Sequence, residues 1–266
     1  MKRIQSLLLA FFAVGVGAGS LASFSPCIAQ TGATTNAPRP SVAQSPRFLP
    51  EILAFEEGDK KAPPPQGAVL FLGSSSIRYW TTLAQDFPEL PVINRGFGGS
   101  QIEDSINYAE RIVLPYKPKL IVFYAGGNDL NDGKAPEAVA KDFQKFADTV
   151  QTALPATTIA FISINPSLKR WEQEGKILQA NTLIEKIIRD TNSPTRKLAY
   201  IDSHAGLLGA DGRPQENLLR PDKLHLNADG YKAWVAIVRP QILALATKAG
   251  VAPSATATAT ATAPAK

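Results

Sequence analysis

Short apolar runs alternate with amphipathic stretches through the central part of the chain. The apolar runs consist mostly of Val, Ile, Leu, Phe and Ala, with no regular alternation of polar side chains. Continuous runs of this kind predict strands that are buried on both faces, as in parallel sheets. Five strands are expected, over residues 68–72, 91–94, 120–124, 158–163 and 198–201.

Helical periodicity separates these strands. Residues 136–154 carry Val139, Phe143 and Phe146 at the spacing of one helix face. Further helices are expected over residues 76–87, 102–113, 172–190 and 227–249. This alternation predicts an α/β protein, a three-layer α/β/α sandwich around a five-stranded parallel sheet in the flavodoxin-like manner. Ligands of such sheets bind at the carboxyl ends of the strands, so the residues that follow each strand are the candidates for function.

The start of the chain has a different pattern. Lys2 and Arg3 precede an apolar run, and small residues follow as far as Ala29. This is typical of a secretory signal peptide, which we expect over residues 1–29. The alternative is a retained membrane anchor, because the run is just long enough to span a bilayer. The first interpretation predicts a secreted or periplasmic protein without a stable membrane span after cleavage.

Two further segments lack large apolar side chains. Residues 30–46 are rich in Thr, Ala, Pro, Ser and Gln and are expected to form a flexible linker. Residues 250–266 are largely Ala, Thr and Pro and are expected to be a disordered tail. The folded domain is therefore expected over residues 47–249.

Composition narrows the classes of function. The 266 residues are 44% hydrophobic and 19% charged, which is typical of a globular chain. One Cys and two His exclude a disulfide scaffold and a Cys/His zinc cluster, so no structural metal is expected. The formal net charge of +5 is spread along the chain instead of forming basic runs. We therefore expect no nucleic-acid partner.

The first strand is followed by Gly73 and three serines, Ser74, Ser75 and Ser76. A hydroxyl group at a strand-to-helix turn suits a nucleophile, because the free N–H groups and the dipole of the helix favour developing negative charge. The alternative is that these serines only cap the helix.

Two other strand ends carry candidate donors for an oxyanion. Three glycines, including Gly99, follow the second strand, and Asn128 follows the third. The glycine loop is not a dinucleotide fingerprint, because the last glycine of that pattern would fall on Gln101. A Gly N–H and an Asn side chain can both donate to an oxyanion. The alternatives are a tight turn for the glycines and an Asx-turn for Asn128.

The two histidines compete for the role of general base. His225 follows Asp222 by three residues just before the last helix, so the carboxylate can orient the imidazole. His204 follows Asp202 by two residues at the end of the fifth strand. The loop position and the Asp spacing favour His225.

Taken together, four segments resemble the SGNH (GDSL-type) hydrolases, and more narrowly a secreted bacterial branch of lysophospholipase-like esterases. The resemblance is carried, in this order along the chain, by FLGSSSI (71–77), NRGFGGS (94–100), GGND (126–129) and DKLH (222–225).

The resemblance implies a role for each matching residue. Its first block implies that Ser75 is the nucleophile, with Ser76 as the alternative if the register slips by one residue. The other three blocks imply an oxyanion hole of Ser75, Gly99 and Asn128, and a triad completed by Asp222 and His225. No metal or organic cofactor is implied.

One residue departs from the family pattern. The family usually has Asp before the nucleophile, and this chain has Ser74. That Asp is not a triad member, so activity is expected to persist, but support of the loop is in question. The second glycine of the α/β-hydrolase elbow is also absent, since Ile77 stands there, and this argues against that fold.

The resulting hypothesis is a secreted serine esterase that acts on short acyl esters, acetylated carbohydrates or lysolipids. An acyltransferase is the nearest alternative, because an alcohol can resolve the same acyl-enzyme. A non-catalytic envelope binding module and a flavodoxin-like carrier are further candidates, because a fold does not by itself imply an activity. Among nearby aromatic and basic residues, Trp80 is expected in the core, whereas Arg170 and Trp171 either border the pocket or anchor their loop.

Overall fold

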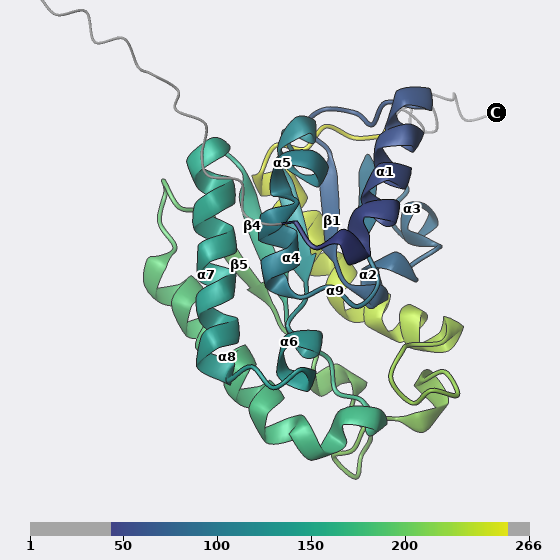
Figure 1. Ribbon diagram of the computed structural model, residues 1–266. Helices are drawn as coiled ribbons and strands as arrows, with labels where there is room; N and C mark the ends of the chain where they lie inside the picture. Colours follow the sequence, from purple (N-terminus) through teal and green to yellow (C-terminus); the bar gives the residue numbers. More distant parts are fainter. Residues whose placement is uncertain (1–43, 255–266) are drawn as a thin grey trace, which may run out of the picture. The chain divides into compact units, whose positions relative to one another are not determined.

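The computed structural model describes residues 44–254 (Figure 1). Five parallel strands form one sheet in the order β2-β1-β3-β4-β5. They are β1 Val69–Gly73, β2 Val92–Gly96, β3 Leu120–Tyr124, β4 Thr158–Ile162 and β5 Leu198–Ile201. This confirms the predicted five-stranded parallel sheet. The strand order reverses between β1 and β3, which is the point where sheets of this type bind their ligands.

Helices cover both faces of the sheet. Leu70 and Leu72 point to one face, and Val69 and Phe71 point to the other, because side chains alternate along a strand. The first face packs against α1 Leu49–Lys61, α4 Ile102–Asn107, α5 Ala109–Ile112, α7 Pro136–Ala153 and α8 Glu174–Thr191. The second face packs against α2 Ser75–Arg78, α3 Leu83–Asp86 and α9 Ala228–Lys248. The predicted three-layer α/β/α sandwich is confirmed.

Two predicted helices are interrupted. The helix expected over 76–87 is divided into α2 and α3, because tight turns around Trp80 replace the regular i→i−4 hydrogen bonds. Trp80 is 1% exposed, packs on Phe71 and Trp234, and donates from its indole N–H to Asp86, so its expected place in the core is confirmed. The helix expected over 102–113 is likewise divided, at Tyr108.

Helix α1 is absent from the prediction. Only Ile52 of its side chains is fully buried, Leu49 and Leu53 are exposed, and no apolar residue follows Phe55, so the apolar pattern is too short to predict the whole helix. The helix is stabilised by its contacts with other parts of the fold. Figure 1 shows it running beside α5, far from it in sequence.

A buried cation joins α1 to the sheet. Arg95 on β2 is 7% exposed and forms an ion pair with Asp59 of α1. Its Nε donates to the Tyr116 hydroxyl at 3.0 Å, and its Nη1 donates to the Asn94 carbonyl at 2.8 Å. Burial, together with the hydrogen bond to Asp59, raises the pKa of Tyr116 to about 12, so the phenol remains neutral.

Removing this cation is expected to destabilise the fold. Arg95→Met leaves the Asp59 carboxylate without its charged partner, so we expect the free energy of unfolding to fall by about 3 kcal/mol. Urea denaturation measures the loss. The control is Arg189→Met, at a guanidinium that is 67% exposed, with an expected change within about 0.5 kcal/mol. Equal midpoints for the two variants would contradict the assigned role of Arg95.

The predicted ends of the chain are described only in part. The signal peptide predicted over 1–29 lies outside the described residues, as does most of the 30–46 linker and of the 250–266 tail. Where these segments are described, they contact the domain. The Ser45 carbonyl accepts from Tyr108, and the Ser254 N–H donates to the Glu89 carbonyl. Within residues 44–254, no helix has the length and apolar character needed to cross a membrane.

Candidate active site

The turn after β1 presents Ser75 at the carboxyl edge of the sheet. Gly73 has a φ of +151°, and a Cβ there would lie 2.0 Å from the Tyr124 carbonyl oxygen, so only glycine fits. The next N–H, that of Ser74, donates to the same Tyr124 oxygen at 3.2 Å. The chain then turns directly into α2, whose first residue is Ser75.

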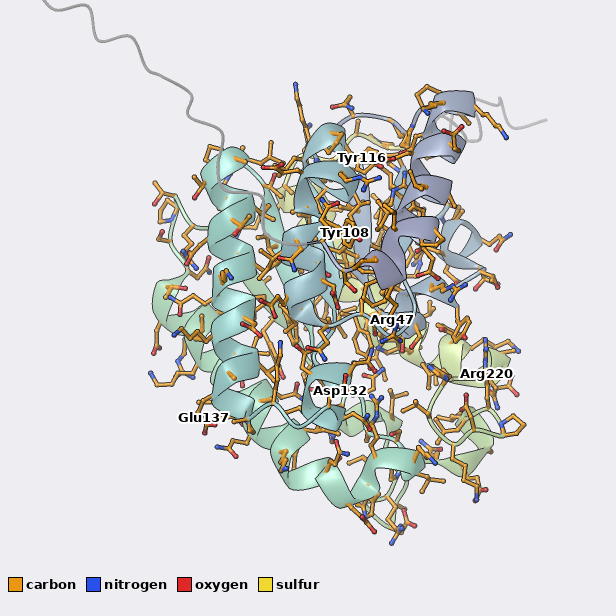
Figure 2. All side chains as sticks on the ribbon, in the orientation of Figure 1. Arg47, Tyr108, Tyr116, Asp132, Glu137 and Arg220 are labelled. Atoms are coloured by element: carbon orange, nitrogen blue, oxygen red, sulfur yellow. The ribbon has the colours of Figure 1, made fainter. Side chains whose placement is uncertain are left out.

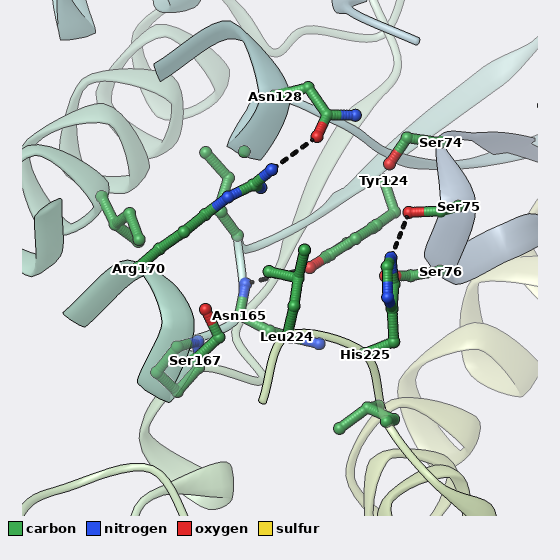
Figure 3. Close-up of a pocket in the computed structure, with 15 residues that line it drawn as sticks. Ser74, Ser75, Ser76, Tyr124, Asn128, Asn165, Ser167, Arg170, Leu224 and His225 are labelled. Carbon is green, nitrogen blue, oxygen red and sulfur yellow. Dashed lines mark hydrogen bonds between the residues drawn. The ribbon is translucent and has the colours of Figure 1, made fainter. Parts of the chain in front are cut away.

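Ser75, His225 and Asp222 form a continuous series of hydrogen bonds. The Ser75 Oγ lies 2.8 Å from His225 Nε2, although 150 positions separate the two residues (Figure 3). On the other side of the ring, His225 Nδ1 lies 2.7 Å from Asp222 Oδ2. This geometry allows the imidazole to accept the serine proton while the carboxylate holds the opposite nitrogen.

The turn that carries His225 is fixed by the same carboxylate. Asp222 Oδ1 accepts the backbone N–H groups of Leu224 at 2.9 Å and of His225 at 3.0 Å. Burial alone would raise the pKa of Asp222, but hydrogen bonds from the His225 ring and from these two N–H groups lower it to about 2. The Tyr79 ring packs edge-on against the imidazole with centroids 5.1 Å apart. Asp222 is therefore an anion beside a ring held in one orientation.

The competing residues do not take part in this series of hydrogen bonds. His204 follows β5, which is three strands away from β1, or roughly 14 Å at the usual spacing. Its Nε2 lies 2.8 Å from Glu174 Oε1, and both side chains are largely buried. Ser76, the second candidate nucleophile, lines the same pocket, but among the described residues the hydrogen bond to His225 Nε2 comes from Ser75. The structure therefore brings Ser75 and His225 together, and separates His204 from both.

Asn128 and Gly99 occupy neighbouring loops at the same edge. Asn128 Nδ2 donates to the Ser100 carbonyl at 3.0 Å, which ties the loop after β3 to the glycine loop after β2. Gly99 has a φ of +80°, a conformation that favours glycine. Within residues 44–254, the N–H groups of Gly99 and Ser75 have no acceptor. Gly99 lines a hollow beside Arg47, whereas Ser75 and Asn128 line the pocket.

A buried carboxylate supports both loops from behind. Asp129 is fully buried, and its two oxygens lie 3.3 Å from the N–H of Ile102, at the start of α4. Lys134 Nζ lies 3.1 Å from the same carboxylate. Burial raises the pKa of Asp129, and the charge of Lys134 opposes that effect. This network holds the loop after β3 against the loop after β2.

The pocket around Ser75 has a polar wall opposite His225. The segment that follows β4 contributes Asn165, Ser167 and Arg170, and all three line the cavity in Figure 3. Trp171 does not line it and instead packs under Arg213, whose Cζ lies 5.5 Å from the ring centroid. Of the two residues considered for the pocket border, only Arg170 therefore lies there. Figure 2 shows how densely side chains fill the surrounding structure.

Sequence reasoning missed several lining residues. Tyr124 ends β3, and its hydroxyl accepts the Asn165 N–H at 3.3 Å across the floor of the pocket. Asn165 and Ser167 follow β4 at the same edge as Ser75. The rule that strand ends carry the site could have singled them out. No cluster of three or more His, Cys, Asp or Glu residues suited to a metal ion is found in the described part of the chain.

Comparison with solved structures agrees with the fold. The described fold resembles a protein from Streptococcus pneumonia, with a TM-score of 0.64, 18% identity, and coverage of 73% of this chain and 92% of that one. It also resembles a GDSL-like lipase from Bacteroides thetaiotaomicron, with a TM-score of 0.59, 17% identity, and coverage of 72% and 96%. A carbohydrate esterase of family 3 from Talaromyces cellulolyticus has a TM-score of 0.56 and 20% identity, with coverage of 68% of this chain and 98% of that one. At these identities the likeness shows the fold alone. No curated protein matches the chain in sequence.

A match to a family model shows which reaction this fold carries out. The match and the fold together identify the protein as a carboxylic ester hydrolase. The model of the GDSL-like lipase/acylhydrolase family matches residues 66–233, a span that includes Ser75, Asn128 and His225. The chain therefore belongs to the GDSL-like lipase/acylhydrolase family.

Proposed function

We propose that the protein is a serine esterase in which Ser75 is the nucleophile, His225 the general base and Asp222 the residue that orients the base. The observation that carries this proposal is the unbroken series of hydrogen bonds from Asp222 through His225 to Ser75. A flavodoxin-like cofactor carrier would not need these three hydrogen-bonded side chains.

This geometry supports the following steps of ester hydrolysis. The Ser75 Oγ attacks the carbonyl carbon as its proton passes to His225 Nε2, giving a tetrahedral oxyanion. The N–H groups of Ser75 and Gly99 and the Nδ2 of Asn128 are the donors we assign to that oxyanion. Collapse breaks the bond to the alcohol, which leaves with the proton from His225. Water then attacks the acyl-enzyme, with His225 again taking the proton, and acid and free Ser75 are released.

The substrate we propose is an ester with a short acyl group, in particular an acetylated carbohydrate. The wall formed by Asn165, Ser167 and Arg170 supports this choice, because such side chains pair with hydroxyl groups. A long acyl chain would need an extended apolar lining, whereas polar side chains outnumber apolar ones in this pocket. The apolar ones are Ile164, Pro166, Ile177, Leu224 and Leu226. Two of the fold's relatives are a carbohydrate esterase and an acetyl-xylooligosaccharide esterase, the latter from Geobacillus.

The location we propose is outside the cytoplasm, on the signal-peptide pattern of residues 1–29. Substrates would then be esters met in the periplasm or outside the cell. An acyltransferase remains the second outcome of the same chemistry, since an alcohol can replace water in the second step. Product analysis in the presence of an added sugar alcohol distinguishes transfer from hydrolysis.

Acyl-length preference tests the proposed substrate. We expect kcat/KM to be greatest for p-nitrophenyl acetate and to fall by about tenfold or more at the octanoate ester, because the polar pocket cannot desolvate a long chain. Release of acetate from acetylated xylo-oligosaccharides is the matching measurement on a carbohydrate. A maximum at octanoate would contradict the short-acyl proposal and favour lysolipids.

The Asp222 carboxylate has a separate expected effect. Asp222→Asn is expected to lower kcat by about 10³–10⁴-fold, because the amide no longer stabilises the charged imidazole or selects its tautomer. The loss should be present at every pH where activity is measurable, since the pKa of Asp222 is about 2 and the carboxylate is ionised throughout. Asp229→Asn, at an exposed carboxylate on α9, is the control. An unchanged kcat for Asp222→Asn would remove Asp222 from the mechanism.

A further inference from the structure

Arg170 is a partly buried cation at the wall of the pocket, and no step of the ester hydrolysis described above uses its charge. It lies in the 3₁₀ segment Leu168–Gln173, between β4 and α8. Burial lowers the pKa of its guanidinium, and no carboxylate within residues 44–254 lies at ion-pair distance from it. Taking a charged group partly out of water without a counter-ion costs free energy, so its position calls for a function.

One carboxylate that acts on Arg170, that of Asp132, is bound by other residues. Asp132 acts on Arg170 through its charge but forms no ion pair with it. Its carboxylate accepts hydrogen bonds from Gln101 Nε2 at 2.8 Å and from Asn131 Nδ2 at 3.2 Å instead. Tyr124 also lies near Arg170, but burial raises the pKa of its phenol, so it carries no negative charge. Among the described residues, the pocket therefore holds one positive charge with no negative charge in contact with it.

The contact that Arg170 does make is with Asn128. Its Nη2 donates to Asn128 Oδ1 at 2.9 Å, as Figure 3 shows, while Asn128 Nδ2 donates to the Ser100 carbonyl at 3.0 Å. Gly127 leaves room for this approach, because a Cβ there would lie 3.1 Å from Arg170 Nη1. The amide is held at both ends, so its oxygen cannot exchange places with its nitrogen. One N–H of Nδ2 remains for the substrate.

We propose that Arg170 is a positioning residue that acts through Asn128 on the transition state, an inference that rests on the oxyanion role proposed above for Asn128. The charged donor on Oδ1 polarises the amide and makes the Nδ2 hydrogen a stronger donor. The tetrahedral oxyanion is the counter-ion that the guanidinium lacks. Because that negative charge exists only in the transition state, Arg170 stabilises the transition state more than the bound ester, and its effect falls on kcat.

The test is a double-mutant cycle on p-nitrophenyl acetate, a neutral ester. Arg170→Met is expected to lower kcat by about 10–100-fold with KM unchanged, and Arg170→Lys, which retains the charge, is expected to recover part of the loss. In an Asn128→Ala background, Arg170→Met should change kcat by less than about threefold, because its partner is already gone. The matched control is Lys169→Met, which removes an exposed charge from the adjacent position and should change kcat by less than about twofold.

Three results would overturn the inference. One is an equal loss from Arg170→Met with and without Asn128, which would show that the two residues act independently. Another is a rise in KM confined to a carboxylate-bearing ester such as mono-p-nitrophenyl glutarate, which would make Arg170 a site for substrate anions. The third is a wild-type kcat for Arg170→Met. If instead Asn128→Ala and Ser75→Ala both retain the wild-type rate, the proposed function itself fails. Urea midpoints for each variant separate these effects from loss of folding.

Discussion

Replacing Ser75 with alanine is expected to lower kcat on p-nitrophenyl acetate by about 10⁴-fold or more. The Oγ of Ser75 is the hydroxyl that hydrogen-bonds His225 Nε2, at 2.8 Å, so its removal leaves the base without a nucleophile to activate. The remaining activity would come from water attacking an ester still bound by the oxyanion donors. KM reports binding of the ground state and is expected to change little.

The adjacent serine supplies the matched control. Ser76→Ala removes a hydroxyl one position further along α2, which lines the same pocket, whereas the hydrogen bond to the imidazole comes from Ser75. We expect this variant to retain kcat within about threefold, because no bond of the reaction involves that hydroxyl. Loss of activity in Ser76→Ala together with an active Ser75→Ala would assign the nucleophile to Ser76.

Replacing His225 with alanine is expected to cost about as much as the loss of Ser75. The imidazole takes the proton in the first step and returns it to the leaving alcohol, so neither step has another base within reach. Because the two residues act as one unit, the Ser75→Ala and His225→Ala double variant should be no slower than either single variant by more than about threefold. The measurement is kcat for the two single variants and the double variant.

The other histidine is the control for this prediction. His204 follows β5 and pairs with Glu174 at the start of α8. The folded His204→Gln variant is therefore expected to keep its activity. Rate losses from Ser75→Ala and His225→Ala that multiplied in the double variant would contradict a shared proton transfer.

Much of the site could be predicted because parallel strands all end at one edge of the sheet. The apolar runs of β3 and β5 predict the observed bounds of both strands, and Ser75 and Asn128 stand shortly after two neighbouring strands. Asp222 and His225 could be paired since they are three residues apart on one turn. Such local relations can be recognised in the sequence. The structure adds that this turn lies beside the end of β1, where His225 meets Ser75.

The residues that escaped prediction depend on contacts between distant parts of the chain. The apolar residues of helix α1 end at Phe55, and its second half is joined by an ion pair to Arg95, on a strand that comes later in the sequence. The contact of Arg170 with Asn128 spans 42 positions, and Tyr79 meets His225 only after folding. No local period or motif encodes such a contact.

The structure also bears on the one departure from the family pattern. Ser74 replaces the usual Asp, and its side chain makes no capping hydrogen bond to α2. The turn is supported by its backbone, because the Ser74 carbonyl accepts the N–H groups of Ile77 and Arg78, each at 3.1 Å. The orientation of Ser75 therefore does not depend on a carboxylate at position 74.

The central claim is that Ser75 is an activated nucleophile, and covalent labelling tests it most directly. The purified protein is treated with a fluorophosphonate, digested, and mapped by mass spectrometry. The account predicts one phosphonyl adduct per chain, on Ser75, with labelling lost in His225→Ala and retained in His204→Gln. Absence of an adduct in folded protein, or an adduct on another serine, would contradict the mechanism.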